Sequence, residues 1–115
     1  MNDAFIYVLS TNGLLFILSL IFWKFPPKKI NSLYGYRTHK SMQNQEIWDF
    51  ANTTFNTHLI KYTALSFVGG LLFAYLYPTN TSWQPMALVI LSILVCIIKT
   101  ERELKENFDE NGKRK

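Results

Sequence analysis

The sequence predicts an all-α integral membrane protein, a three-helix bundle with an additional interfacial amphipathic helix on the cytoplasmic side. Three apolar stretches, at about residues 4–23, 59–77 and 83–98, have the length and composition of membrane spans. Lys and Arg are absent before Lys24 and between Tyr62 and Ile98, whereas a soluble domain carries such charges over its whole surface. The 115 residues therefore predict a single membrane domain.

The first predicted span ends before Lys24 and the helix-stopping pair Pro26-Pro27. A signal peptide is the rival interpretation, but the N-terminal flank has no Lys or Arg and no small-residue cleavage site follows. Asn12 interrupts the span, and a lone amide is costly in lipid. We therefore expect Asn12 to face another helix, either as an interhelical hydrogen-bonding contact or as part of a polar functional site.

Residues 41–58 have the pattern of an amphipathic helix that runs into the second span. Ser41 is the candidate N-cap of this helix. Its apolar face continues into the span and is formed by Ile47, Ala51, Phe55, Leu59 and Tyr62. We expect the helix to lie along the membrane interface with Trp48 at headgroup depth. The alternative, that the helix packs under the bundle, stays open.

The second and third spans are expected to be antiparallel neighbours, because only the short loop Thr79–Ser82 joins them. The second span carries small residues at four-residue spacing, Ser66, Gly70 and Ala74, which allow another helix to approach closely. Pro85 suits the first turn of the third helix.

The segment after Lys99 is a charged tail. Glu101 and Lys105 have the spacing of an ion pair on a helix surface, so we expect the third helix to continue for a turn or two beyond residue 98. Gly112 is a candidate helix stop, and residues 113–115 are predicted to be disordered.

A polar segment between the first two spans is the most motif-like part of the chain. Tyr34-Gly35-Tyr36-Arg37-Thr38 predicts a turn, because Gly35 permits a positive φ that its neighbours resist. Arg37 presents a planar fork of donors that suits a carboxylate, a phosphate or a set of backbone carbonyl groups. Its role is either to tie the loop to the bundle or to bind a ligand or partner.

This segment resembles the signature of the SdpI family of small bacterial membrane proteins. The resemblance rests on the motif residues Asn31, Tyr34, Gly35, Tyr36, Arg37, Thr38, Ser41, Glu46, Trp48 and Asn52. The aromatic-Gly-aromatic-Arg-Thr core followed by a Trp about ten residues later is a fairly specific family marker.

The resemblance implies a membrane protein without enzymatic activity, and it makes the motif residues the candidate site for a partner or for membrane lipid. In the founding case the family member protects against a secreted toxin and, on binding it, recruits a cytoplasmic repressor. This chain has three predicted spans, whereas the founding protein is longer and has more. Toxin immunity and a general envelope role, including envelope signalling, are therefore both expectations.

The distribution of basic residues predicts the orientation. Six lie from residue 24 to residue 61, Lys24, Lys28, Lys29, Arg37, Lys40 and Lys61, and the other six follow residue 98. The positive-inside rule then places these two segments in the cytoplasm and the N-terminus outside, in a bacterial inner-membrane protein.

The remaining function classes have weaker support in the sequence. A subunit of a small oligomeric transporter or channel is the alternative function, and it would require a homo-oligomer because three spans are too few to enclose a pathway. A membrane enzyme would draw on Arg37, His39, His58, Glu46 and Asp49, but no pair has the spacing of a catalytic motif. With one cysteine, Cys96, and no ligand cluster, we expect no metal and no cofactor. The net charge of +4 reflects the segments beside the membrane rather than nucleic-acid binding.

Overall fold

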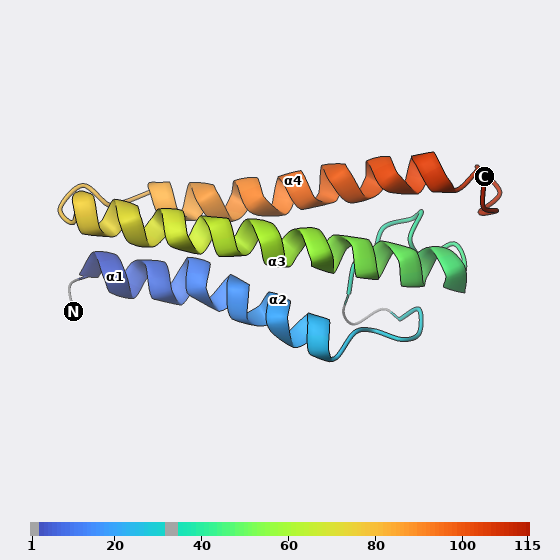
Figure 1. Ribbon diagram of the computed structural model, residues 1–115, viewed down its shortest axis with the longest axis horizontal. Helices are drawn as coiled ribbons and strands as arrows, with labels where there is room; N and C mark the ends of the chain where they lie inside the picture. Colours follow the sequence, from blue (N-terminus) through green and yellow to red (C-terminus); the bar gives the residue numbers. More distant parts are fainter. Residues whose placement is uncertain (1–2, 32–34) are drawn as a thin grey trace.

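The computed structural model describes residues 3–31 and 35–115 and has three long helices in an up-down-up arrangement (Figure 1). The first comprises α1 (Asp3–Val8), a π-helical turn η1 (Leu9–Gly13) and α2 (Leu14–Lys24). The second is α3 (Gln45–Leu76) and the third is α4 (Gln84–Asn107). All three are long and apolar enough to cross a membrane. The all-α membrane bundle predicted from the sequence is thus confirmed.

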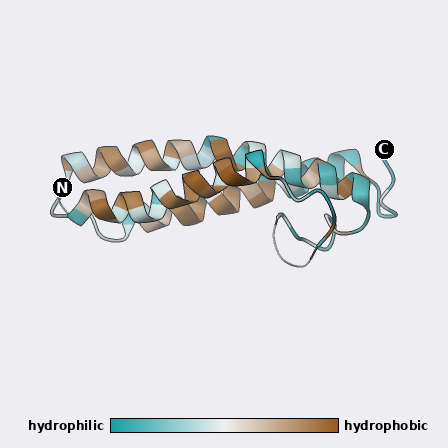
Figure 2. Cartoon of the chain, turned by 90° about the horizontal axis from the view of Figure 1, so that it is seen from below, coloured by the Kyte–Doolittle hydropathy of each residue, from teal (hydrophilic) through white to brown (hydrophobic). Residues whose placement is uncertain are grey.

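The bundle has two chemically different ends. The N-terminus and the loop between α3 and α4 lie at one end (Figure 1). The other end, here called the motif end, holds the segment between α2 and α3, the first turns of α3, and the C-terminal residues. Hydrophobic residues dominate the middle of the bundle and hydrophilic residues dominate the motif end (Figure 2). The extents of the molecule are 52 × 24 × 18 Å, so its long axis exceeds a hydrocarbon core of about 30 Å.

The first helix is held against the others through Asn12, which is 1% exposed. Its amide nitrogen donates to Oγ of Ser66 at 2.7 Å and lies 3.2 Å from the carbonyl oxygen of Pro85. The expectation that Asn12 faces another helix is confirmed, and the contact is interhelical. The π-helical turn lies at this position, where the hydroxyl of Thr11 also bonds to the carbonyl oxygen of Tyr7 at 2.8 Å.

The small residues of α3 form the predicted contact stripe, because Ser66, Gly70 and Ala74 are all buried. A Cβ atom placed on Gly70 would lie 3.0 Å from Cγ1 of Val8, which leaves no room for a larger side chain without adjustment. The stripe therefore permits the close approach of α1 that the sequence indicated.

The interfacial helix expected over residues 41–58 is not confirmed as a separate element, since α3 is one continuous helix of 32 residues. At 1.5 Å per residue it is about 48 Å long. No Pro and no Gly interrupts the sequence from Gln45 to Val68, so the amphipathic segment and the second span share one axis.

The prediction that Ser41 caps this helix is wrong. Asn44 is the N-cap, and its Oδ1 accepts a hydrogen bond of 2.8 Å from the backbone N–H of Ile47.

The third helix continues beyond residue 98, as predicted, and ends at Asn107, slightly further than the expected one or two turns. Gly112 does not end it, but occupies a turn with φ of +80°. The prediction of disorder at residues 113–115 is also wrong, since Phe108 and Arg114 form an isolated β-bridge. The backbone N–H groups of Asn111 and Lys113 both donate to Oδ1 of Asp109 at 2.9 Å, and these bonds order the turn.

Candidate functional site at the motif end of the bundle

The motif residues fall into a buried set and an exposed set. The buried set is Tyr36, Ser41, Trp48 and Asn52, and the exposed set is Gly35, Arg37 and Glu46. Asn31 and Thr38 are half-buried, and Tyr34 lies outside the described residues. Residues 35–41 form the motif loop.

Asn52 holds the start of the motif loop against α3. Its Oδ1 accepts a 2.5 Å hydrogen bond from the backbone N–H of Tyr36, and its amide nitrogen donates to the carbonyl oxygen of Trp48 at 3.0 Å. A wheel places Asn52 on the polar face of the helix, and its burial here comes from the loop that covers it. The side chain therefore replaces the backbone pairing that an irregular loop lacks.

Gly35 is required at this contact for two reasons. Its φ is +103°, a conformation that L side chains rarely adopt. A Cβ atom at this position would also lie 2.6 Å from Cγ of Pro27 and 2.8 Å from Oδ1 of Asn52. The predicted glycine turn is therefore present. It packs directly on Pro27, which belongs to the connector that follows α2, residues 25–31.

The depth of Trp48 relative to the lipid headgroups stays a prediction, but its side chain is covered by protein rather than by headgroups. The residue is fully buried, and its Nε1 donates a 2.7 Å hydrogen bond to the carbonyl oxygen of Pro27. The first turns of α3 continue the axis of the second span, and the motif loop and the C-terminal residues cover their apolar face.

The hydroxyl group of Ser41 holds the loop backbone around Arg37. Oγ of Ser41 accepts a 2.7 Å hydrogen bond from the backbone N–H of Thr38 and lies 2.9 Å from the carbonyl oxygen of Tyr36. Ser41 is completely buried. The backbone on both sides of Arg37 is thus held by side chains of the motif, while Arg37 itself is exposed.

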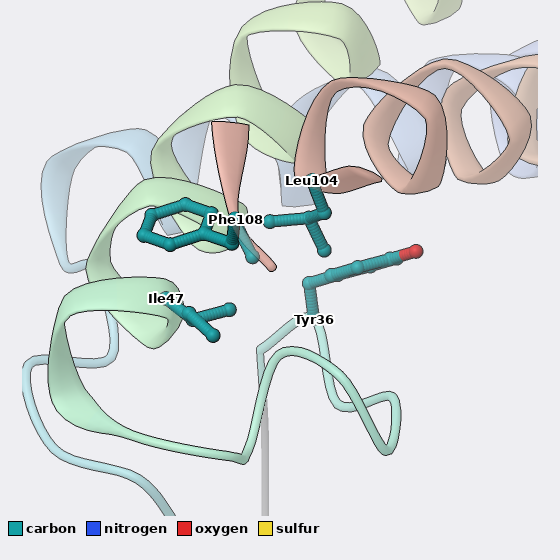
Figure 3. Close-up of a cluster of buried hydrophobic side chains, with 5 residues drawn as sticks. Tyr36, Ile47, Leu104 and Phe108 are labelled. Carbon is teal, nitrogen blue, oxygen red and sulfur yellow. The ribbon is translucent and has the colours of Figure 1, made fainter. Parts of the chain in front are cut away.

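The ring of Tyr36 joins the motif loop to α3 and α4. It stacks on Phe55 with a centroid separation of 4.6 Å, and it belongs to a buried cluster with Ile47, Ala51, Leu104 and Phe108 (Figure 3). Its hydroxyl donates to Oε1 of Glu101 at 2.5 Å. Helical spacing predicts that Glu101 pairs with Lys105, whereas this carboxylate accepts the hydrogen bond of Tyr36. Burial, and next the hydrogen bond to Glu101, raise the pKa of Tyr36 above its ordinary value.

The C-terminal segment closes over the motif loop in an arrangement here called the tail clasp, formed by residues 108–114 on residues 40–50. Lys40 donates through Nζ to the carbonyl oxygen of Asp109, and the amides of Gln43 and Asn44 donate to those of Glu110 and Gly112 at 2.9 and 2.8 Å. The guanidinium carbon of Arg114 lies 5.3 Å from the ring centroid of Phe50 and 5.2 Å from that of Phe108. Sequence reasoning missed this contact, although a Phe inside a charged tail is a signal for it.

Three of the residues considered for catalysis, His58, Glu46 and Asp49, each contact a residue outside that set. His58 Nε2 lies 2.8 Å from Oε2 of Glu103, Glu46 lies 3.9 Å from Arg114, and Asp49 accepts from Gln45 at 2.7 Å. Within residues 3–31 and 35–115, no three His, Cys, Asp or Glu side chains converge as a metal ion would require.

A cleft of about 290 Å³ lies between the end of α2, the connector and the motif-end half of α3. Its wall includes three motif residues, Gly35, Tyr36 and Asn52. The rest of the wall is largely aromatic and proline side chains, among them Phe22, Trp23, Pro26, Pro27 and Phe55.

Comparison with known proteins identifies the family to which the motif belongs. Residues 28–100 match the SdpI/YfhL protein family, and this match spans more than half of the chain. The chain belongs to the SdpI/YfhL family. The matched region includes every motif residue from Asn31 to Asn52, so the resemblance noted in the sequence is confirmed.

The chain is also similar to a protein of Bacillus subtilis (strain 168) with the name "Uncharacterized protein YfhL". The two proteins are 36% identical over 94 residues, which cover 81% of each chain. No solved structure matches this chain. Family membership and the three apolar helices identify a multi-pass membrane protein of the SdpI/YfhL family.

Proposed function

We propose that this chain is a non-enzymatic protein of the bacterial cytoplasmic membrane that binds a protein partner through the exposed side of its motif loop. The observation that carries the proposal is the division of the motif. Its buried members hold the loop in one conformation, and that conformation presents Arg37 at the surface. A preorganised exposed Arg loses little freedom when its planar fork binds a carboxylate.

The positive-inside rule supports a cytoplasmic position for the motif end. All of the 12 Lys and Arg residues lie between residues 24 and 61 or after residue 98. Lys61 and Lys99 stand over the ring of Tyr62, with Nζ to centroid distances of 5.5 and 5.6 Å, at the level where the apolar part of α3 begins and that of α4 ends. The partner is then a toxin that has entered the membrane or a cytoplasmic regulator, in immunity or in envelope signalling.

The alternative function, a subunit of an oligomeric transporter or channel, has less support. Several polar side chains of the long helices are engaged in contacts between helices. Asn12 bonds to Ser66, Oγ of Ser19 lies 3.3 Å from Oγ1 of Thr63, and Asn56 donates to the carbonyl oxygen of Ser19 at 3.0 Å. Such contacts serve packing, whereas a permeation path needs polar groups that face water.

The test is a pull-down from native membranes with the wild-type chain, Arg37→Ala and Arg37→Lys. Loss of the same partner in both variants is expected, because a point charge does not replace the planar fork. Arg102→Ala is the matched control, since Arg102 is also exposed and pairs only at 3.8 Å with Glu106 on its own helix.

Melting temperatures in detergent separate binding from a structural role of Arg37. A structural tie predicts that Arg37→Lys loses about 1–3 kcal/mol of stability, the range for a charge-assisted bond left unmade. Recovery of the partner at wild-type levels by all three variants would contradict the proposal.

A further inference from the structure

The cleft beside the motif loop lies where the membrane-spanning part of the bundle gives way to its polar end. The first span ends at Lys24, and the cleft begins at Phe22 and Trp23. Trp23 is 68% exposed, as an aromatic side chain at a membrane boundary commonly is. On α3 the wall extends to Leu59, two residues before Lys61. The cleft is therefore within reach of the acyl chains of the adjacent leaflet.

Three polar side chains in the wall of the cleft already donate hydrogen bonds within the protein. Asn52 donates to the carbonyl oxygen of Trp48, Asn56 to that of Ser19, and Thr57 to that of Thr53 at 2.9 Å. An occupant that must form several hydrogen bonds would find few partners here. An apolar chain, which needs only packing against aromatic and proline side chains, suits the cleft better.

Three lysines, here called the rim lysines, lie close to lining residues of the cleft in the sequence. Lys24, Lys28 and Lys29 are exposed and flank the lining residues Trp23, Pro26 and Pro27 along the chain. The residues that line the cleft include no Asp and no Glu. This charge distribution complements the phosphate of an anionic headgroup and gives less advantage to a zwitterionic one.

We propose that the cleft is a binding site for one anionic phospholipid, with an acyl chain inside the cleft and the headgroup phosphate beside the three rim lysines. Because Gly35 and Tyr36 form part of the wall, the bound chain contacts the motif loop and supports the conformation that presents Arg37. The site goes beyond the partner-binding role proposed above, and lipid can bind here whether or not that role is correct.

The test is native mass spectrometry of the full chain, purified in a mild detergent with phosphatidylglycerol and phosphatidylcholine of identical acyl chains. The wild-type protein is expected to retain one phosphatidylglycerol. Thr53→Phe, which adds a ring to the cleft wall without removing a contact between helices, is expected to lower retention about tenfold, equivalent to about 1.4 kcal/mol. Val68→Phe adds similar bulk on an exposed part of the same helix and should retain lipid as the wild type does.

The headgroup preference is tested with the triple variant Lys24→Gln, Lys28→Gln and Lys29→Gln. It should retain both lipids equally. Its control removes three charges from the other basic segment, at Lys105, Lys113 and Lys115, and should keep the preference for phosphatidylglycerol. Equal retention by Thr53→Phe and the wild type, or an unchanged preference in the rim variant, would overturn the proposal.

A second measurement does not depend on the folding of any variant. Phosphatidylglycerol with a photoreactive acyl chain, incorporated with the wild-type protein into vesicles, should label the two wall segments, residues 22–27 and 53–59, above all other peptides. Labelling spread evenly over the three spans would mean that lipid only surrounds the bundle.

Discussion

The hydroxyl group of Tyr36 donates a 2.5 Å hydrogen bond to Oε1 of Glu101, and this contact holds the motif loop against α4. Because the pKa of Tyr36 is raised, the folded protein retains the phenolic proton more strongly than the unfolded chain does. The protonated phenol therefore contributes fully to the free energy of unfolding below the ordinary pKa of about 10. This contribution is lost as the pH rises above that value.

Replacing Tyr36 with Phe should make the protein less sensitive to alkali. At neutral pH we expect a loss of about 1 kcal/mol for the missing hydrogen bond, and above pH about 10 a smaller further loss than in the wild type. Thermal unfolding followed by circular dichroism at a series of pH values measures both effects. Tyr75→Phe, at a residue that is 72% exposed, should keep the wild-type pH dependence. Parallel curves for Tyr36→Phe and the wild type would contradict this account.

Gly35→Ala is expected to destabilise the motif end by about 1–3 kcal/mol. The new Cβ would require a left-handed conformation and would overlap Pro27 and Asn52. Gly69→Ala is the matched control, because its Cβ would meet Cδ1 of Leu88 at an ordinary 3.7 Å and the helix gains up to about 1 kcal/mol. Denaturant titration in detergent should separate the two variants, and equal stabilities would mean that the turn at Gly35 is misplaced.

The three tryptophans should differ in their accessibility to quenchers. Trp48 is fully buried, whereas Trp23 and Trp83 are 68% and 69% exposed. In variants that keep one Trp each, lipid-attached quenchers should act on Trp23 and Trp83 and only weakly on Trp48, which aqueous iodide should also fail to reach. Strong quenching of Trp48 by shallow lipid-attached quenchers would mean that Trp48 faces the headgroups, as expected from the sequence.

Reporter fusions test the orientation proposed from the basic residues. A reporter that is active only in the cytoplasm should give a signal when fused after Lys115 and none when inserted at Asn80. The opposite pattern would place the motif end outside the cell and remove cytoplasmic regulators as partners.

The tail clasp should protect the motif loop from solvent. Removing residues 108–115 takes away Phe108, Arg114 and the carbonyl groups that Lys40, Gln43 and Asn44 use. Hydrogen exchange of residues 38–50 should then accelerate about tenfold or more, since the loss of contacts of about 1.4 kcal/mol shifts an opening equilibrium by that factor. The span residues 60–75 serve as the internal control and should exchange as before.

The spans could be predicted from the sequence because their signals are local. Apolar length, the placement of Lys and Arg, and the small residues of α3 each carry their meaning without knowledge of a neighbour. Asn12 could also be predicted to face another helix, since an amide in lipid must find a hydrogen-bonding partner.

The motif end could not be predicted to the same degree, because its order depends on contacts between distant segments. An apolar stripe containing Ile47 and Ala51 looks the same whether it faces lipid headgroups or a covering loop, and only the loop and Phe108 decide between them. The tail clasp uses backbone carbonyl groups as acceptors, and these have no sequence signature. The burial of Trp48 follows from the same contacts.

The distance in sequence between the two halves of the tail clasp has a consequence for the biogenesis of the protein. Lys40 leaves the ribosome well before Asp109, so the motif loop waits for the segment that closes it. The three spans can enter the bilayer and join through Asn12 and Ser66 in the meantime. Completion of the motif end then follows insertion of the spans. A nascent chain stalled within α4 would lie in the membrane with the motif loop not yet covered by residues 108–114.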